Sequence, residues 1–306
     1  MAKRLITYRQ ARRSDMLACA RVFVRTARDL ARRQGKASPP MRPRDTARAI
    51  AHLQRTDPRG FHVAVSGGRV VAFASTIVRG KTHFLSMFWA LPGLQNKGVG
   101  RRVLQRAFDG PRPPAHAVRC VYASLDVRAQ VLYLKFGMLP RGMFYLLKGK
   151  PTASPRPKRS VELVPVGKPG RTSRKMLAIA ARFDRKFRAA RRDADIRYVM
   201  SLPGARFFVA RAGRATIGYA VVNRKGRIGP AGVVDSRYSA GLAWAIKEAA
   251  RAMGAKELFV VVPGVNAGAL GAFFDAGLRT EFFGAWMSAK PVGAFDGYVL
   301  AGGMLL

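Results

Sequence analysis

The two halves of this 306-residue chain repeat one another, and this repeat restricts the fold more than any other feature of the sequence. Segments 61–72 and 207–218 each open on Phe-x-Val-Ala and read as a β-hairpin. Segments 126–137 and 266–277 each place a polar residue, an alanine, an aromatic ring and a glycine at the same spacing. The offset between the halves drifts only from 146 to 140 residues. We therefore expect a tandem duplication, in which one folding unit occurs twice.

A proline-rich basic segment separates the two halves. Residues 149–160 hold three prolines among lysines and arginines, so they cannot pack as a core and they resist regular structure. The sequence predicts a domain at 1–148, a linker at 149–160 and a second domain at 161–306. A length of 306 residues agrees with two domains of ordinary size.

Hydrophobic periodicity predicts alternating strands and helices in the first half. We expect strands at 5–9, 61–65, 70–78, 82–90, 118–123 and 139–147, and helices at 14–34, 43–54, 99–108 and 128–136. The second half repeats this pattern. Mixed strands and helices indicate two α/β (α+β) units and exclude a helical bundle.

The segment between the fourth expected strand and the third expected helix has the composition of a phosphate-binding loop. Gly98 and Gly100 allow close backbone approach and φ angles that other residues avoid. A helix that starts near Val99 directs its unpaired amides into this loop, where they can hold a phosphate. The loop has neither the Gly-Lys-Ser/Thr ending of a Walker A motif nor the third glycine of a Rossmann fingerprint. Three basic residues add positive charge: Lys97, Arg101 and Arg102.

The string Gln95-x-x-Gly-x-Gly100, after a strand and before a helix, resembles motif A of the GNAT superfamily of acyl-CoA N-acyltransferases. Residues 126–138 are similar to motif B of that family, with aspartate where asparagine is usual. The resemblance covers residues 3–150 well and residues 161–306 more faintly. It implies two tandem GNAT-like domains, each a mixed, mainly antiparallel twisted sheet flanked by helices. It also implies an N-acetyltransferase that moves an acetyl group from acetyl-CoA to a primary amine.

The resemblance also implies which residues form the site. In GNAT proteins the strand before motif A splays from its neighbour and pairs with the pantetheine arm of acetyl-CoA. The motif-A loop holds the pyrophosphate, and the first residue of motif B contacts the coenzyme. The motif-B tyrosine, here Tyr133, protonates the leaving thiolate, and a phenol with an ordinary pKa of about 10 carries that proton at neutral pH. The implied coenzyme-binding residues are Phe88, Trp89, Ala90, Gln95, Asn96, Lys97, Gly98, Val99, Gly100, Arg101, Arg102 and Asp126, and no metal is expected.

The general base stays open. Many relatives use a glutamate on the splayed strand, but residues 1–150 contain no glutamate. Ordered water alone is one alternative, and a substrate that arrives as a free amine needs little from a base. The other candidates are His52, His62, His83, His116, Asp45 and Asp57.

The second half departs from both motifs. Residues 232–242 lack the paired glycines of motif A, and Phe273 stands where the first half has Tyr133. We expect a degenerate copy that binds no coenzyme or binds it without turnover. Its expected role is structural, completing an acceptor pocket or an interface.

The charge of the chain permits a rival function. Lys and Arg number 56 against 16 Asp and Glu, a net charge of +40, and residues 1–150 alone hold 30 against 6. Such a field attracts RNA, DNA or other anions and repels cationic acceptors. Alternatives are therefore an inert GNAT-fold protein that binds RNA or DNA, and an acetyltransferase acting on an RNA-borne amine. Arginine-rich coding bias is the plainer explanation.

The remaining composition favours a cytoplasmic protein. The N-terminal residues have no apolar run typical of a secretory signal, and we expect no membrane contact. Cys19 and Cys120 are the only cysteines, too few for a disulfide framework or a metal cluster.

Overall fold

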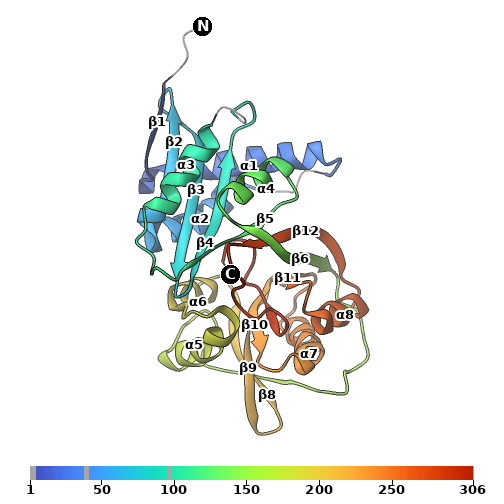
Figure 1. Ribbon diagram of the computed structural model, residues 1–306. Helices are drawn as coiled ribbons and strands as arrows, with labels where there is room; N and C mark the ends of the chain where they lie inside the picture. The colour runs from blue at the N-terminus through green and yellow to red at the C-terminus, as the bar shows by residue number, and fades with distance from the viewer. Residues whose placement is uncertain (1–4, 38–40, 95–97, 306) are drawn as a thin grey trace. The chain divides into compact units, whose positions relative to one another are not determined.

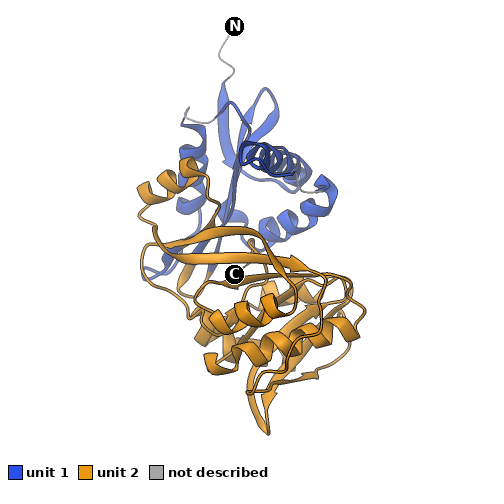
Figure 2. Ribbon diagram, turned by 90° about the vertical axis from the view of Figure 1, so that its right-hand side faces the viewer, with its two compact units in different colours: residues 1–78, 83–119 blue, residues 79–82, 120–306 orange. Residues whose placement is uncertain are grey.

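The chain forms two compact units (Figure 2). A computed structural model describes residues 5–37, 41–94 and 98–305. Unit 1 comprises residues 1–78 and 83–119, and unit 2 comprises residues 79–82 and 120–306. This division does not follow the expected linker, because the end of the first half belongs to unit 2.

Unit 1 is a sheet of four strands in the order β1-β2-β3-β4, with antiparallel pairing of β1 with β2 and of β2 with β3. Its elements are β1 (Ile6–Gln10), α1 (Met16–Arg33), α2 (Pro43–Thr56), β2 (Phe61–Ser66), β3 (Arg69–Arg79), β4 (Thr82–Ala90) and α3 (Val99–Asp109). Short 3-10 turns precede α1 and β2, at Arg13–Asp15 and Pro58–Gly60. Each expected element of the first half is confirmed to within two residues at either end.

The helices of unit 1 lie beside its sheet (Figure 1), and each buries apolar residues. In α1 the ring of Phe23 lies edge-on to Trp89 of β4, with centroids 4.7 Å apart. In α3 the ring of Phe108 lies edge-on to His83 of β4, at 5.0 Å. These contacts fix α1 and α3 against β4, the strand that leads into the glycine-rich loop. None of the helices in the described ranges is long and apolar enough to cross a membrane.

Unit 2 contains two sheets, with strand orders β5-β12-β6-β11 and β13-β10-β9-β8-β7. Its strands are β5 (Val118–Ala123, from Cys120 onward), β6 (Leu139–Gly149), β7 (Glu162–Pro165), β8 (Ala205–Ala212), β9 (Ala215–Asn223), β10 (Ile228–Val233), β11 (Leu258–Pro263), β12 (Arg279–Ser288) and β13 (Tyr298–Val299). Its helices are α4 (Val127–Lys135), α5 (Arg174–Arg188), α6 (Asp193–Met200), a 3-10 turn at Ser236–Tyr238, α7 (Ser239–Ala252) and α8 (Ala267–Asp275).

The two halves of the chain exchange strands. Strand β6, from the first half, lies between β11 and β12, both from the second half. Leu147 of β6, for example, is paired with Val260 of β11 and with Thr280 of β12. Because strands of the second half satisfy the backbone groups on both edges of β6, the first half has no separate closing strand. This exchange is why the unit boundary falls near residue 120 and not at 149–160.

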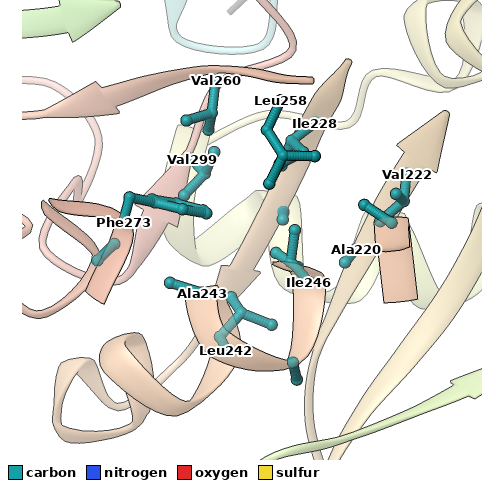
Figure 3. Packing of buried hydrophobic residues seen from close by; sticks show 14 of the residues in the cluster. Ala220, Val222, Ile228, Leu242, Ala243, Ile246, Leu258, Val260, Phe273 and Val299 are labelled. Carbon is teal, nitrogen blue, oxygen red and sulfur yellow. The ribbon is translucent and has the colours of Figure 1, made fainter. Parts of the chain in front are cut away.

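An apolar cluster packs inside unit 2 between its sheets and α7 and α8 (Figure 3). Ile246 of α7, Phe273 of α8 and Val260 of β11 are fully buried in it. Leu147 of β6 belongs to the same cluster, so the exchanged strand shares the core of the second half.

Candidate functional site

The first turn of α3 has the geometry of an anion-binding helix terminus. Gly98 caps the helix in the left-handed conformation, with φ 71°, and no side chain caps it. The amide of Arg102 makes the first intrahelical bond, to the Gly98 carbonyl at 3.1 Å. The amides of Val99, Gly100 and Arg101 therefore precede the helical ladder and carry the positive end of the helix dipole.

The side chains around this turn favour a negatively charged ligand. Arg101 and Arg102 are exposed, and the first turn contains no acidic residue. Gly100 permits the close approach of α3 to β4, because a Cβ there would lie 3.0 Å from the ring of Phe88. The predicted ligands Gln95, Asn96 and Lys97 lie outside the described residues.

The end of β4 is less buried than the rest of the strand. Residues 82–87 are buried, whereas Phe88, Trp89 and Ala90 are half-buried. The Thr26 hydroxyl of α1 donates a hydrogen bond to the Ala90 carbonyl at 3.2 Å. A carbonyl has two lone pairs, so Ala90 keeps the capacity to accept a second donor.

The contacts of β4 show that its side chains do not alternate regularly. His83 contacts Phe108 of α3, and Phe88 lies against Gly100 of the same helix. These two residues are five positions apart, and in a regular strand they would point to opposite faces. Strand β4 therefore has an irregularity between His83 and Phe88, of the kind that ends strand pairing and redirects side chains beside binding sites.

Tyr133 and Asp126 belong to unit 2, on α4. The Asp126 carboxylate caps that helix: it accepts the Arg128 amide at 3.1 Å and pairs with the Arg128 guanidinium at 2.9 Å. Tyr133 is 6 % exposed, and burial, followed by the negative charge of Asp126, raises the pKa of its phenol well above the ordinary value. Tyr133 is therefore protonated at neutral pH, as a proton donor requires.

Burial lowers the pKa of two histidines on the strands of unit 1, His62 and His83. His83 is 2 % exposed, and burial, with a smaller contribution from Arg119, lowers its pKa to about 4. Burial and then Arg106 lower the pKa of His62. His52 is also buried, at 2 % exposed, and its Nδ1 lies 3.4 Å from the Arg55 guanidinium. The buried rings of His52 and His83 pack within the fold.

The other candidate bases are more accessible. His116 and Asp45 are exposed, and Asp57 is half-buried, with its carboxylate accepting the Val78 amide at 3.3 Å. The structure gives none of them a contact to the end of β4, so the base stays unassigned among the described residues.

A groove of about 860 Å³ in unit 1 is a feature that sequence reasoning missed. It runs along α1 and is lined by Arg21, Val24, Arg25, Arg28, Asp29, Arg32, Lys36, Pro43 and Pro92. The signal was present in the sequence: arginines at positions i, i+4, i+7 and i+11 share one face of a helix.

In the second copy, the strand that corresponds to β4 is β10, and its edge is paired with a later segment of the chain. β10 pairs with β13 through Ala231 with Val299 and Gly232 with Tyr298. On the other side, the Leu300 amide donates to the Val261 carbonyl of β11 at 3.0 Å. Residues 298–300 therefore lie between β10 and β11.

A buried polar network anchors this inserted segment. Arg192 donates to the Tyr298 hydroxyl at 2.7 Å and forms a two-pronged ion pair with Asp184. Tyr219 donates to the Asp184 carboxylate at 2.6 Å. All four side chains are at most 3 % exposed, so the network is shielded from bulk solvent and each member is hydrogen-bonded to another.

Within the described ranges, no three His, Cys, Asp or Glu side chains come together in a way that could hold a metal ion. The donors at the start of α3 are backbone amides and guanidinium groups, which suit an anion.

Comparison with known sequences identifies a family for the first half. Residues 25–138 match the sequence model of the family described as Acetyltransferase (GNAT) family. No curated protein sequence matches the chain.

Comparison with solved structures extends the fold to the whole chain. A Pyrococcus horikoshii protein described as a candidate acetyltransferase aligns with a TM-score of 0.76 at 18% identity, over 100% of this chain and 97% of that one. A GCN5-related N-acetyltransferase from Sphaerobacter thermophilus aligns with a TM-score of 0.64 at 15% identity, over 95% of this chain and 98% of that one. A tandem GNAT protein from the clavulanic acid biosynthesis pathway aligns with a TM-score of 0.56 at 16% identity, over 94% of this chain and 99% of that one. At these identities the likeness establishes the fold.

Proposed function

Because residues 25–138 match the Acetyltransferase (GNAT) family and the whole chain has the fold of tandem GNAT proteins, we propose that it is an acetyl-CoA-dependent N-acetyltransferase acting on a primary amine. The active copy is residues 1–148, joined by the segment 149–160 to a degenerate copy at 161–306. Transfer draws on the activated acyl thioester that acetyl-CoA supplies.

The N-terminus of α3 is the observation that carries this proposal. Its left-handed glycine cap, free of any side-chain cap, leaves three amides for an anion, and Arg101 and Arg102 flank them. An aspartate or glutamate in that turn would oppose a pyrophosphate, and none is present. The residues therefore fit the pyrophosphate of acetyl-CoA.

The chain's own residues then have distinct tasks. The backbone of Phe88, Trp89 and Ala90 orients the acyl carrier along β4, while α3 holds its phosphates. Tyr133 donates a proton to the departing sulfur from a phenol that burial keeps protonated. A side-chain contact from Asp126 to the coenzyme is the weakest part of this set, because its carboxylate already caps α4.

The degenerate copy is proposed to bind no coenzyme. The edge of β10 that would pair with a pantetheine arm is paired with β13. Phe273, at the Tyr133 position, is fully buried in the apolar core and has no proton to give. Its role is to complete the fold of the first copy by supplying β11 and β12 to β6.

Incubation of the protein with acetyl-CoA and separate classes of amine, followed by mass spectrometry for a gain of one acetyl group, tests the proposal. We expect acetylation of at least one primary amine, which Tyr133→Phe slows. Binding of RNA without acetyl-CoA binding would instead support the inert nucleic-acid protein, which no contact in the structure favours over the enzyme.

A further inference from the structure

The solvent-facing side of α1 carries a row of arginines. Arg21, Arg25, Arg28 and Arg32 recur every three or four residues, so they lie along one face of the helix. At 1.5 Å per residue the row is about 16 Å long. All four side chains are exposed, while the opposite face of α1 is buried against the sheet.

This row lines a groove that is strongly positive. The groove is the 860 Å³ groove of unit 1, and its walls carry five cationic side chains and one carboxylate. That carboxylate, Asp29, is already paired with Arg32 at 2.6 Å and with Arg33 at 3.0 Å. Among the residues that the structure describes, Arg21 and Arg25 have neither an ion pair nor a hydrogen-bond partner.

The groove opens beside the end of β4. Thr26, one residue after Arg25, donates to the Ala90 carbonyl, and Phe23 packs on Trp89. Pro92, two residues beyond Ala90, is itself part of the groove wall. A molecule in the groove therefore lies next to the strand that the proposed function assigns to acetyl-CoA.

The chemistry of the groove selects a class of occupant. Guanidinium groups one helix turn apart repel each other, and an oxyanion between them relieves that repulsion. Planar guanidinium forks bind phosphate by paired hydrogen bonds, and arginine outnumbers lysine here by four to one. A volume of about 860 Å³ suits a small molecule.

We propose that the arginine groove binds a phosphate group of the amine acceptor, so that the substrate of this enzyme is a phosphorylated primary amine. This inference rests on the proposed function for the role of β4. The anion site itself rests only on unit 1.

The matched acceptors O-phosphoethanolamine and ethanolamine test the proposal at saturating acetyl-CoA. We expect kcat/KM to be at least tenfold higher for the phosphorylated amine. The double variant Arg21→Glu/Arg25→Glu brings the ratio close to one and leaves the Kd for acetyl-CoA within threefold. The control Arg59→Glu/Arg69→Glu changes the net charge equally at exposed arginines outside the groove and keeps the ratio.

Calorimetry with inorganic tripolyphosphate tests the anion site without turnover, in the presence and absence of saturating acetyl-CoA. With acetyl-CoA bound, we expect one saturable site that Arg21→Glu/Arg25→Glu weakens at least tenfold and the control does not. Without acetyl-CoA, the start of α3 offers a second site that neither double variant weakens. No saturable binding, or equal weakening in both double variants, overturns the site. If tripolyphosphate binds as expected but acetyl-CoA does not, the proposed function fails and the anion site stands.

Three other results would also contradict the proposal. Equal kcat/KM for the two amines in the wild type shows that phosphate is not recognised. A tenfold loss of acetyl-CoA affinity in Arg21→Glu/Arg25→Glu assigns the groove to the coenzyme. A general polyanion surface is indicated if a single-stranded RNA oligomer binds more tightly than tripolyphosphate and if the groove variant and the control variant weaken that binding equally.

Discussion

The side chain of Asn266 donates a hydrogen bond to the backbone carbonyl of Tyr298 across 3.0 Å. Asn266 caps α8 and occupies the position that Asp126 occupies in the first copy. In the first copy the acidic cap bonds to Arg128 of its own helix, whereas in the second copy the cap also bonds to Tyr298 of β13. In the second copy, the residue that caps α8 thus also helps to hold β13, the strand that pairs with the edge of β10.

Replacing Tyr298 with phenylalanine should destabilise unit 2. The change removes the acceptor of the 2.7 Å bond from Arg192, in a network at most 3 % exposed. A buried charged donor that loses a partner costs about 1–3 kcal/mol. Urea unfolding followed by tryptophan fluorescence measures the change.

Tyr238→Phe is the matched control for that variant. Its ring is half-buried and makes a cation–π contact with Arg159, which phenylalanine preserves. We expect a change of less than about 0.5 kcal/mol. Equal destabilisation by both variants would show that the Tyr298 hydroxyl does not anchor β13.

Tyr133→Phe should lower kcat about 100-fold and leave the Kd for acetyl-CoA within threefold, because it removes a proton donor and keeps the ring. Tyr145→Phe, another unit 2 tyrosine, stacked on Phe283, is the control and should leave kcat unchanged. Because burial raises the Tyr133 pKa above its ordinary 10, kcat should show no alkaline loss from this group below pH 10. An alkaline limb near pH 8 that disappears in Tyr133→Phe would contradict the buried phenol.

The stability of unit 1 should fall on acidification between pH 6.5 and pH 4. The pKa of His83 is about 4 in the folded protein against an ordinary 6.5, so the unfolded chain takes up the proton first. Stability contributed by the neutral ring is complete above pH 6.5 and is lost as pH falls towards 4, amounting to about 3 kcal/mol. Urea midpoints measured across this range check the slope.

His83→Gln removes the titrating ring and should flatten that slope. His116→Gln, at an exposed histidine, should leave it unchanged. An unaltered slope in His83→Gln would mean that other groups account for the acid sensitivity.

Local patterns predicted the elements and the family because both are written in short stretches of sequence. The apolar and aromatic run in residues 82–90 and the glycine spacing at 98 and 100 each depend on a few neighbouring positions. The strand exchange could not be read in this way. Leu147 has the same apolar character whether it pairs within its own half or with Val260, so pattern alone leaves the partner undetermined.

The site was predicted only in part, for a similar reason. Motif comparison found the α3 terminus and Tyr133, but it could not show that Arg128 engages Asp126. It also gave His83 a place among the bases, whereas that ring is buried against Phe108 and its lowered pKa makes it a weak base. The α1 arginines were counted only as net charge, although their spacing already placed them on one helix face.

Titration of the folded protein with acetyl-CoA in a calorimeter tests the central claim most directly. We predict saturable binding of one acetyl-CoA per chain, weakened at least tenfold by Arg101→Glu at the start of α3. Arg112→Glu, the same charge change at an exposed residue beyond that helix, should leave the affinity within threefold. Absence of saturable binding, or an affinity that Arg101→Glu leaves unchanged, would contradict a coenzyme site at the N-terminus of α3. Binding of two acetyl-CoA molecules per chain would contradict the proposal that the second copy binds no coenzyme.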